Sequence, residues 1–164
     1  MPQNSEPVKI QGMSMGMILV MAAALLSAVI ALVISNTGPK RQIKWQTNLK
    51  QTTRLARENQ LPVMMYFTID GCPPCKYMKT KVYPNPAVAD LIETKFIPFK
   101  QNLSNASDEQ VQFAISLGIT AFPTIVFFNT DAREVKRIES AVAPDEMVNI
   151  LQQVLKSVDD STVE

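Results

Sequence analysis

The two cysteines of this chain stand at positions 72 and 75, directly after a run of mostly apolar side chains. That run, residues 63–69, is typical of a strand buried on both faces. The next segment, residues 76–82, contains no glycine or proline and spaces its apolar residues along one side of a helix. The cysteines therefore stand at a turn between a buried strand and a helix, with Cys72 at the N-terminus of that helix.

This position favours the thiolate form of Cys72. The unpaired N–H groups and the positive dipole end of a helix lower the pKa of a cysteine below its free value of about 8.5. A thiolate is the species that attacks disulfides, so Cys72 and Cys75 are a candidate redox pair. A purely structural disulfide is the alternative, but so short a loop restricts the unfolded chain little.

The composition excludes several classes of site. The chain of 164 residues has 16 basic and 15 acidic side chains, so no basic field predicts nucleic-acid binding. It has no histidine, which excludes His-based nucleophile pairs and His-containing metal sites. A zinc site would need cysteines from a second chain or additional carboxylates. We therefore predict no metal and no cofactor other than the disulfide itself.

The N-terminal part of the chain predicts a membrane anchor. After a polar tail, residues 1–12, residues 13–35 contain no charged side chain. A helix of about 20 residues crosses a hydrocarbon core of about 30 Å. A buried core helix and a cleaved signal peptide are the alternatives. The apolar region of a signal peptide spans only about 7 to 15 residues and ends in a small-residue cleavage site, which is not evident here. We expect an uncleaved transmembrane signal anchor.

The rest of the chain predicts one α/β domain, residues 47–157, between a basic juxtamembrane linker, residues 36–46, and a disordered tail, residues 158–164. Trp45 of the linker is a candidate for the membrane interface. Pro98 suggests an irregular start to the second strand. The βαβ order favours a central mixed sheet covered by helices on both faces. The expected helices are 47–59, 76–82, a short one from 87, 108–117 and one from 144; the expected strands are 63–69, 96–99, 125–128 and 134–138.

The residues from about 45 to 156 resemble the thioredoxin superfamily, and within it the membrane-anchored or exported thioredoxin-like proteins. The resemblance rests on two motifs, PVMMYFTIDGCPPCK at 62–76 and AFPTIVFF at 121–128. It implies that Cys72 is the nucleophile, Cys75 is the buried resolving thiol, and Pro123 is a cis-proline packed against the disulfide. It further implies active-site support from Pro73 and Pro74, and a substrate groove along Gly71, Phe122, Ser140 and Ala141.

The sequence departs from the superfamily pattern in three ways, one of which is the Pro73-Pro74 dipeptide between the cysteines. Tyr66 replaces a buried Asp that assists proton transfer at the resolving thiol, and Gly71 replaces a Trp. Asp70 either supplies a carboxylate near the thiols or is a solvated strand end, and we favour the second interpretation. Lys76, Lys79 and Lys81 are interpreted as an exposed helix face, with support of a thiolate as the alternative.

The predicted function is that of a membrane-tethered thiol–disulfide oxidoreductase acting on protein thiols and disulfides, with a membrane electron donor or acceptor as a candidate partner. A non-catalytic docking or assembly module of a membrane complex is the alternative. The six basic residues of the segment 36–57 favour a cytoplasmic domain by the positive-inside rule. Protein disulfides persist outside the cytoplasm, and long domains translocate despite their charge. We expect a single-pass protein of the inner membrane whose domain faces the periplasm.

Overall fold

The computed structural model describes residues 42–161, together with residues 20, 23 and 25–27. The predicted tail, residues 1–12, and most of the predicted anchor, residues 13–35, lie outside the described residues. Among the residues that the structure does describe, no helix has the length and apolar character needed to cross a membrane.

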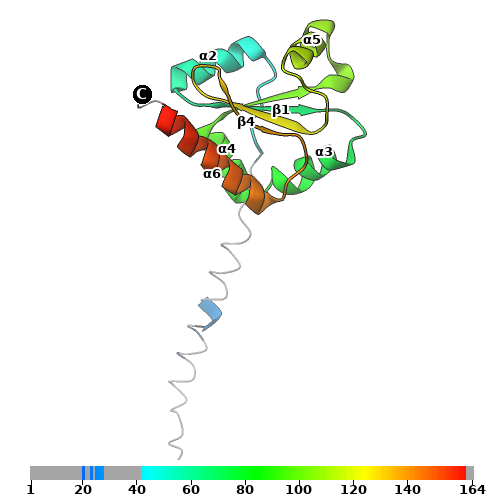
Figure 1. Cartoon of the computed structure of the whole chain (residues 1–164). Coiled ribbons are helices and arrows are strands. Elements are labelled where there is room, and N and C mark those ends of the chain that lie inside the picture. Colours follow the sequence, from blue (N-terminus) through cyan, green and yellow to red (C-terminus); the bar gives the residue numbers. More distant parts are fainter. Residues whose placement is uncertain (1–19, 21–22, 24, 28–41, 162–164) are drawn as a thin grey trace, which may run out of the picture. The chain divides into compact units, whose positions relative to one another are not determined.

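A mixed four-stranded sheet forms the centre of the domain, in the order β2-β1-β3-β4 (Figure 1). The central strand β1 (Val63–Thr68) runs parallel to β2 (Ile97–Asn102) and antiparallel to β3 (Thr124–Phe128). The edge strand β4 (Glu134–Ile138) forms an antiparallel hairpin with β3. All residues of β1 are buried, as the uninterrupted apolar run predicts.

Pro98 interrupts neither β2 nor its pairing with β1. The parallel register runs without a break from Val63 opposite Ile97 through Met64 opposite Pro98. The carbonyl oxygen of Pro98 accepts a hydrogen bond from the backbone N–H of Gln46 at 2.8 Å, on the side away from β1. A proline lacks its N–H on that outer side, so no bond of the sheet is lost. The prediction of an irregular start to this strand is therefore wrong.

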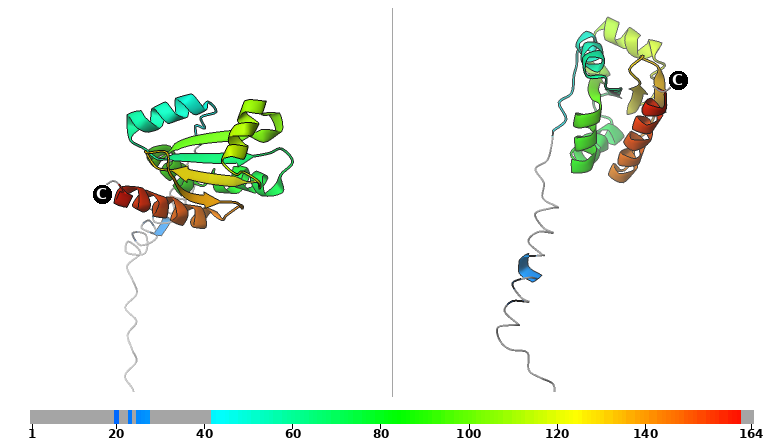
Figure 2. Two further views of the ribbon diagram at one scale, coloured as in Figure 1. Left: turned by 45° about the horizontal axis from the view of Figure 1, so that its top comes forward. Right: turned by 90° about the vertical axis from the view of Figure 1, so that its left-hand side faces the viewer.

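Helices cover both faces of the sheet, which confirms the predicted architecture (Figure 2). One layer consists of α2 (Leu49–Asn59) and α5 (Asp108–Ser116), which pack against a core that includes Phe67, Phe99 and Val126. The other layer consists of α3 (Pro73–Tyr77), its continuation η1 (Met78–Val82), α4 (Pro86–Lys95) and α6 (Pro144–Ser161). A single turn, η2 (Leu103–Asn105), follows β2.

The folded domain extends beyond the predicted boundaries at both ends. Ile43 is only 8% exposed and belongs to the core, and Trp45 packs against the same cluster. Residues 43–46, which we assigned to a linker with Trp45 near a membrane surface, are thus part of the domain. At the other end α6 continues to Ser161, because Val158, 7% exposed, extends the apolar stripe of that helix. Residues 158–161 are helical, not part of a disordered tail.

A capping box begins α5, and its removal should lower the stability of the domain. The Ser107 hydroxyl accepts from the Gln110 N–H at 3.4 Å, and the Gln110 side chain accepts from the Ser107 N–H at 2.8 Å. Ser107→Ala should lower the free energy of unfolding by about 1 kcal/mol, measured by urea titration. The control is Ser116→Ala at the other end of α5, whose hydroxyl bonds only to the Phe113 carbonyl. Equal effects of the two substitutions would contradict the capping role.

Candidate active site

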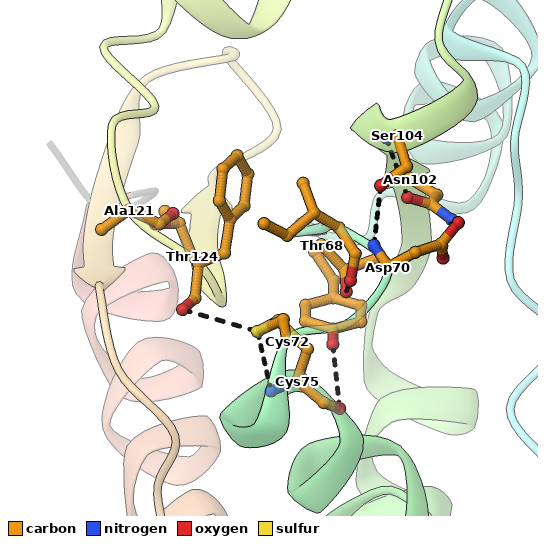
Figure 3. Close-up of a disulfide and its surroundings, with 11 residues drawn as sticks. Thr68, Asp70, Cys72, Cys75, Asn102, Ser104, Ala121 and Thr124 are labelled. Carbon is orange, nitrogen blue, oxygen red and sulfur yellow. Dashed lines mark hydrogen bonds between the residues drawn. A yellow bond between two sulfur atoms is a disulfide. The ribbon is translucent and has the colours of Figure 1, made fainter.

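A fixed loop leads from β1 to the cysteines. Gly71 has φ of 70°, a left-handed conformation that a side chain disfavours. Asp70 accepts hydrogen bonds from the side-chain amides of Asn102 at 2.8 Å and Asn105 at 3.3 Å. The backbone N–H of Asp70 donates to the Ser104 hydroxyl at 2.7 Å (Figure 3). Asp70 is exposed, as the favoured interpretation of a solvated strand end expects, and its hydrogen bonds also tie the loop to the end of β2 and to η2.

The cysteines form a disulfide at the start of α3. Cys72 is the N-cap residue, and its Sγ accepts a hydrogen bond from the backbone N–H of Cys75 at 3.1 Å. This confirms the predicted placement of Cys72 at a helix N-terminus. Cys75 is only 4% exposed, whereas Cys72 is partly exposed. An incoming thiol or disulfide can therefore reach the first sulfur, while the second stays covered by protein.

The segment that enters β3 lies beside the disulfide. The peptide bond between Phe122 and Pro123 is cis, the isomer that the resemblance implies. The carbonyl oxygen of Phe122 lies 3.7 Å from Cys72 Sγ, and Pro123 is buried. The Thr124 hydroxyl donates to the Ala121 carbonyl at 2.7 Å and closes this turn. Segments that are distant in sequence are thus brought together at Cys72.

Some of the other predicted site residues lie beside the disulfide, and others do not. Pro73 and Pro74 are exposed in the first turn of α3, where a backbone N–H has no helical partner in any case. A hollow of ≈ 690 Å³ beside the disulfide is lined by Gly71, Cys72, Pro73 and Cys75, among others. Ser140 and Ala141 do not line it: they lie between β4 and α6, and Ala141 packs against the core.

Tyr66 takes the place below Cys75 where the superfamily has a carboxylate. Its hydroxyl donates to the Cys75 carbonyl oxygen at 3.4 Å. Its ring centroid lies 5.7 Å from that of Trp45 and 5.1 Å from that of Tyr83, and the other two rings are 5.0 Å apart. Burial raises the pKa of Tyr66, with a smaller opposing effect of its hydrogen bond to Thr68. The group beneath the resolving cysteine is therefore neutral at physiological pH.

Lysine side chains supply the positive charge near the disulfide. Lys79 and Lys100 line the same hollow as Cys72 and Cys75. Burial lowers the pKa of Lys100, repulsion by Lys79 lowers it further, and attraction by Asp70 partly offsets both effects. Lys79 is carried by η1, a turn of π-helix that follows α3. The sequence reading missed Lys100, Trp45 and Tyr83; the one available signal was that Trp45 is the only tryptophan.

This fold and its paired cysteines define a thiol–disulfide oxidoreductase. The family model described as "Thioredoxin-like domain" matches residues 49–155, and the chain belongs to this family. It is 28% identical over 109 residues to the thiol:disulfide interchange protein DsbD of Photorhabdus laumondii. That match covers 66% of this chain but only 17% of the relative, so the chain corresponds to a small part of that protein.

Solved structures show the same fold. A thioredoxin from Thermus thermophilus superimposes with a TM-score of 0.64 at 26% identity, over 72% of this chain and 91% of the thioredoxin. The oxidised C-terminal domain of DsbD from Neisseria meningitidis gives a TM-score of 0.59 at 17% identity, over 66% of this chain and 97% of that domain. These matches confirm the thioredoxin-like fold expected from the two motifs.

Proposed function

We propose that the protein is a membrane-tethered oxidoreductase that exchanges its Cys72–Cys75 pair with protein thiols and disulfides. The observation that carries the proposal is the asymmetry of the pair. Cys72 is partly exposed, whereas Cys75 is buried. The Sγ atom of Cys72 accepts a hydrogen bond from the Cys75 N–H at 3.1 Å and lies 3.7 Å from the Phe122 carbonyl oxygen. The reactive sulfur is thus open to a partner, and the resolving sulfur is protected from competing thiols.

In the reductive direction, the Cys72 thiolate attacks one sulfur of a substrate disulfide. A bond forms between Cys72 and that sulfur, and the other substrate sulfur leaves with the electron pair and takes up a proton. The Cys75 thiolate then attacks Cys72 Sγ, which forms the protein disulfide and releases the second substrate thiol. Two electrons have moved from protein to substrate. The oxidative direction reverses each step, and the reduction potentials of the partners decide between the two.

Neighbouring groups support these steps. The N–H of Cys75, which points at Cys72 Sγ, stabilises the Cys72 thiolate, the attacking species in one direction and the leaving group in the other. We assign the backbone beside Pro123 to pairing with an extended substrate, because the Phe122 carbonyl lies next to Cys72 Sγ. Pro73 and Pro74 begin the helix without leaving an N–H unpaired. The Tyr66 hydroxyl donates a hydrogen bond to the Cys75 carbonyl oxygen and, being neutral, adds no charge beside the resolving thiol.

The proposed tether is the uncharged segment 13–35, with the domain in the periplasm. This placement is supported by the length of the uncharged run and by the persistence of protein disulfides outside the cytoplasm. The relative from Photorhabdus laumondii, by its name a thiol:disulfide interchange protein, is consistent with such a role. A domain held at a membrane would exchange electrons with a membrane donor or acceptor and would need no other cofactor.

The experiment combines location with redox state. The full-length chain is expressed in a bacterial host, and intact spheroplasts are treated with a membrane-impermeant maleimide after mild reduction. We expect the chain in the carbonate-washed membrane fraction, with Cys72 labelled before lysis. Labelling only after lysis would place the domain in the cytoplasm, and release by carbonate would rule out the anchor.

The direction of exchange is read from the reduction potential of the cysteine pair, measured in glutathione and dithiothreitol buffers by thiol alkylation. A value near about −270 mV would make the protein a reductant, and one near about −120 mV an oxidant. If the cysteine pair could not be reversibly oxidised and reduced, the proposed exchange would be contradicted. The alternative function, a non-catalytic docking module, would then be favoured.

A further inference from the structure

A second cavity, of ≈ 350 Å³, lies beside the hollow that contains the disulfide. The two share Tyr66, Lys79 and Lys100 in their linings, so they adjoin at these side chains. Trp45, Tyr66 and Tyr83, whose rings pack together, all line the second cavity. Its full lining is Gln42, Ile43, Trp45, Tyr66, Lys79, Tyr83, Pro84 and Lys100.

The two lysines of this cavity have no ion-paired carboxylate among the residues that the structure describes. Neither amino group forms an ion pair or side-chain hydrogen bond within the part of the chain that the structure describes. They repel each other, since Lys79 lowers the pKa of Lys100. The carboxylate of Asp70 attracts Lys100, but both its oxygens already accept hydrogen bonds from asparagine amides. A bound anion would relieve this repulsion.

Tyr83 lines the cavity, and its buried hydroxyl lacks a hydrogen-bond partner among the described residues. Buried hydroxyls in folded proteins are rarely left unpaired. Desolvation by burial, with a further contribution from Tyr66, raises the pKa of Tyr83 well above its ordinary value, so this hydroxyl remains a neutral donor. A carboxylate that entered between the lysines would bring an acceptor into this cavity.

We propose that this cavity is a specificity site for an acidic residue of the polypeptide whose thiol or disulfide reacts at Cys72, with the carboxylate held between Lys79 and Lys100. The proposal rests on the function proposed above and names the class of substrate segment that this function would take. The methylene groups of the same residue and its neighbours pack on Trp45.

A polypeptide fits better than a free small molecule because the second cavity adjoins the hollow that contains the disulfide. A chain bound at Cys72 through the Phe122 backbone can place a nearby side chain across Tyr66 into the second cavity. The charges agree with this choice. Lys76, Lys79 and Lys100 line the disulfide hollow, and Asp70 is its one acidic residue, whereas the chain as a whole has a net charge of only +1.

Fluorescence of Trp45, the only tryptophan, reports occupancy of the cavity without any redox reaction. The oxidised full-length chain is titrated with tryptophan-free peptides in which serine replaces the reactive cysteine. One peptide set places a single glutamate at successive positions on either side of the serine, and the matched set has glutamine there. We expect the best glutamate peptide to bind about tenfold more tightly than its glutamine partner, the factor that corresponds to about 1.4 kcal/mol.

The double variant Lys79→Gln/Lys100→Gln should reduce this preference to about one. The control, Lys136→Gln on the exposed edge strand β4, should keep it. Equal binding of both peptide sets to the native chain, or a preference that survives the double variant, would overturn the proposal. The proposal of a polypeptide ligand would also be overturned if phenylacetate, a small free carboxylate, bound as tightly as the best peptide. Because these peptides cannot exchange, a negative result here is separate from failure of the cysteine chemistry.

Discussion

Replacement of Cys72 by serine should lower the rate of exchange with a peptide disulfide by at least about a thousandfold, the order expected when a covalent nucleophile is lost. Serine keeps the size and can still cap α3, but its hydroxyl does not ionise near neutral pH. The buried Cys75 does not compensate, because it is only 4% exposed. The rate is measured by stopped-flow mixing of the reduced full-length chain with a dye-quenched peptide disulfide.

The matched variant is Cys75→Ser, which keeps the nucleophile and removes the resolving thiol. It should react once and stop as a mixed disulfide between Cys72 and the peptide, visible by mass spectrometry and released by dithiothreitol. If both single variants turned over like the native chain, the cysteine pair would not be the catalytic centre. If Cys75→Ser formed the adduct and Cys72→Ser did not, the roles proposed from exposure and capping would be confirmed.

The cysteine turn was predictable because its determinants are local. A buried strand, a glycine before the first cysteine, and a helical segment after the second one follow one another along the chain. Their short-range pattern is sufficient to place Cys72 at the helix N-terminus. The edge character of β4 was predictable for the same reason, since its alternating exposure follows directly from alternating side chains.

The aromatic group beneath the disulfide was not predictable from such patterns. Trp45, Tyr66 and Tyr83 belong to three separate segments, and only the folded chain brings their rings within 5.7 Å. Before the fold is known, a tryptophan that follows a basic stretch has the composition of a membrane-interface residue. The role of Asp70 depended in the same way on Asn102 and Asn105, which approach it only because β2 pairs with β1.

Lys79, which we interpreted as part of a solvated face with support of a thiolate as the alternative, lies within the π-helical turn η1. Residues 76–82 were read as one regular helix, but the Tyr83 N–H donates to the Met78 carbonyl at 2.9 Å, a spacing of five residues. Such a turn shifts the side chains after it relative to an α-helix. Lys79 is exposed as predicted, yet it also lines the cavity. Periodicity alone gives no signal for this local change.

Removal of the Phe127 ring should cause the largest loss of stability. Phe127 is fully buried on β3, pairs with Met64 on β1, and packs edge-to-face on Phe96 with centroids 5.7 Å apart. Phe127→Ala should reduce the free energy of unfolding by about 3–5 kcal/mol, because surrounding side chains only partly fill the space. Urea unfolding of the full-length chain, followed by Trp45 fluorescence, measures the change.

The control is Ile115→Ala on α5, where the side chain is 58% exposed and the change should stay within about 0.5 kcal/mol. Domains of this size have total stabilities of about 5–15 kcal/mol, so Phe127→Ala should populate unfolded chains under mild conditions. A loss below about 1 kcal/mol would contradict the packing of Phe127 against Phe96 in the core. Because β3 continues directly from Pro123, the same loss should weaken the support of the segment beside Cys72. Exchange activity should therefore fall with the folded fraction as urea is added, at lower concentrations than in the native chain.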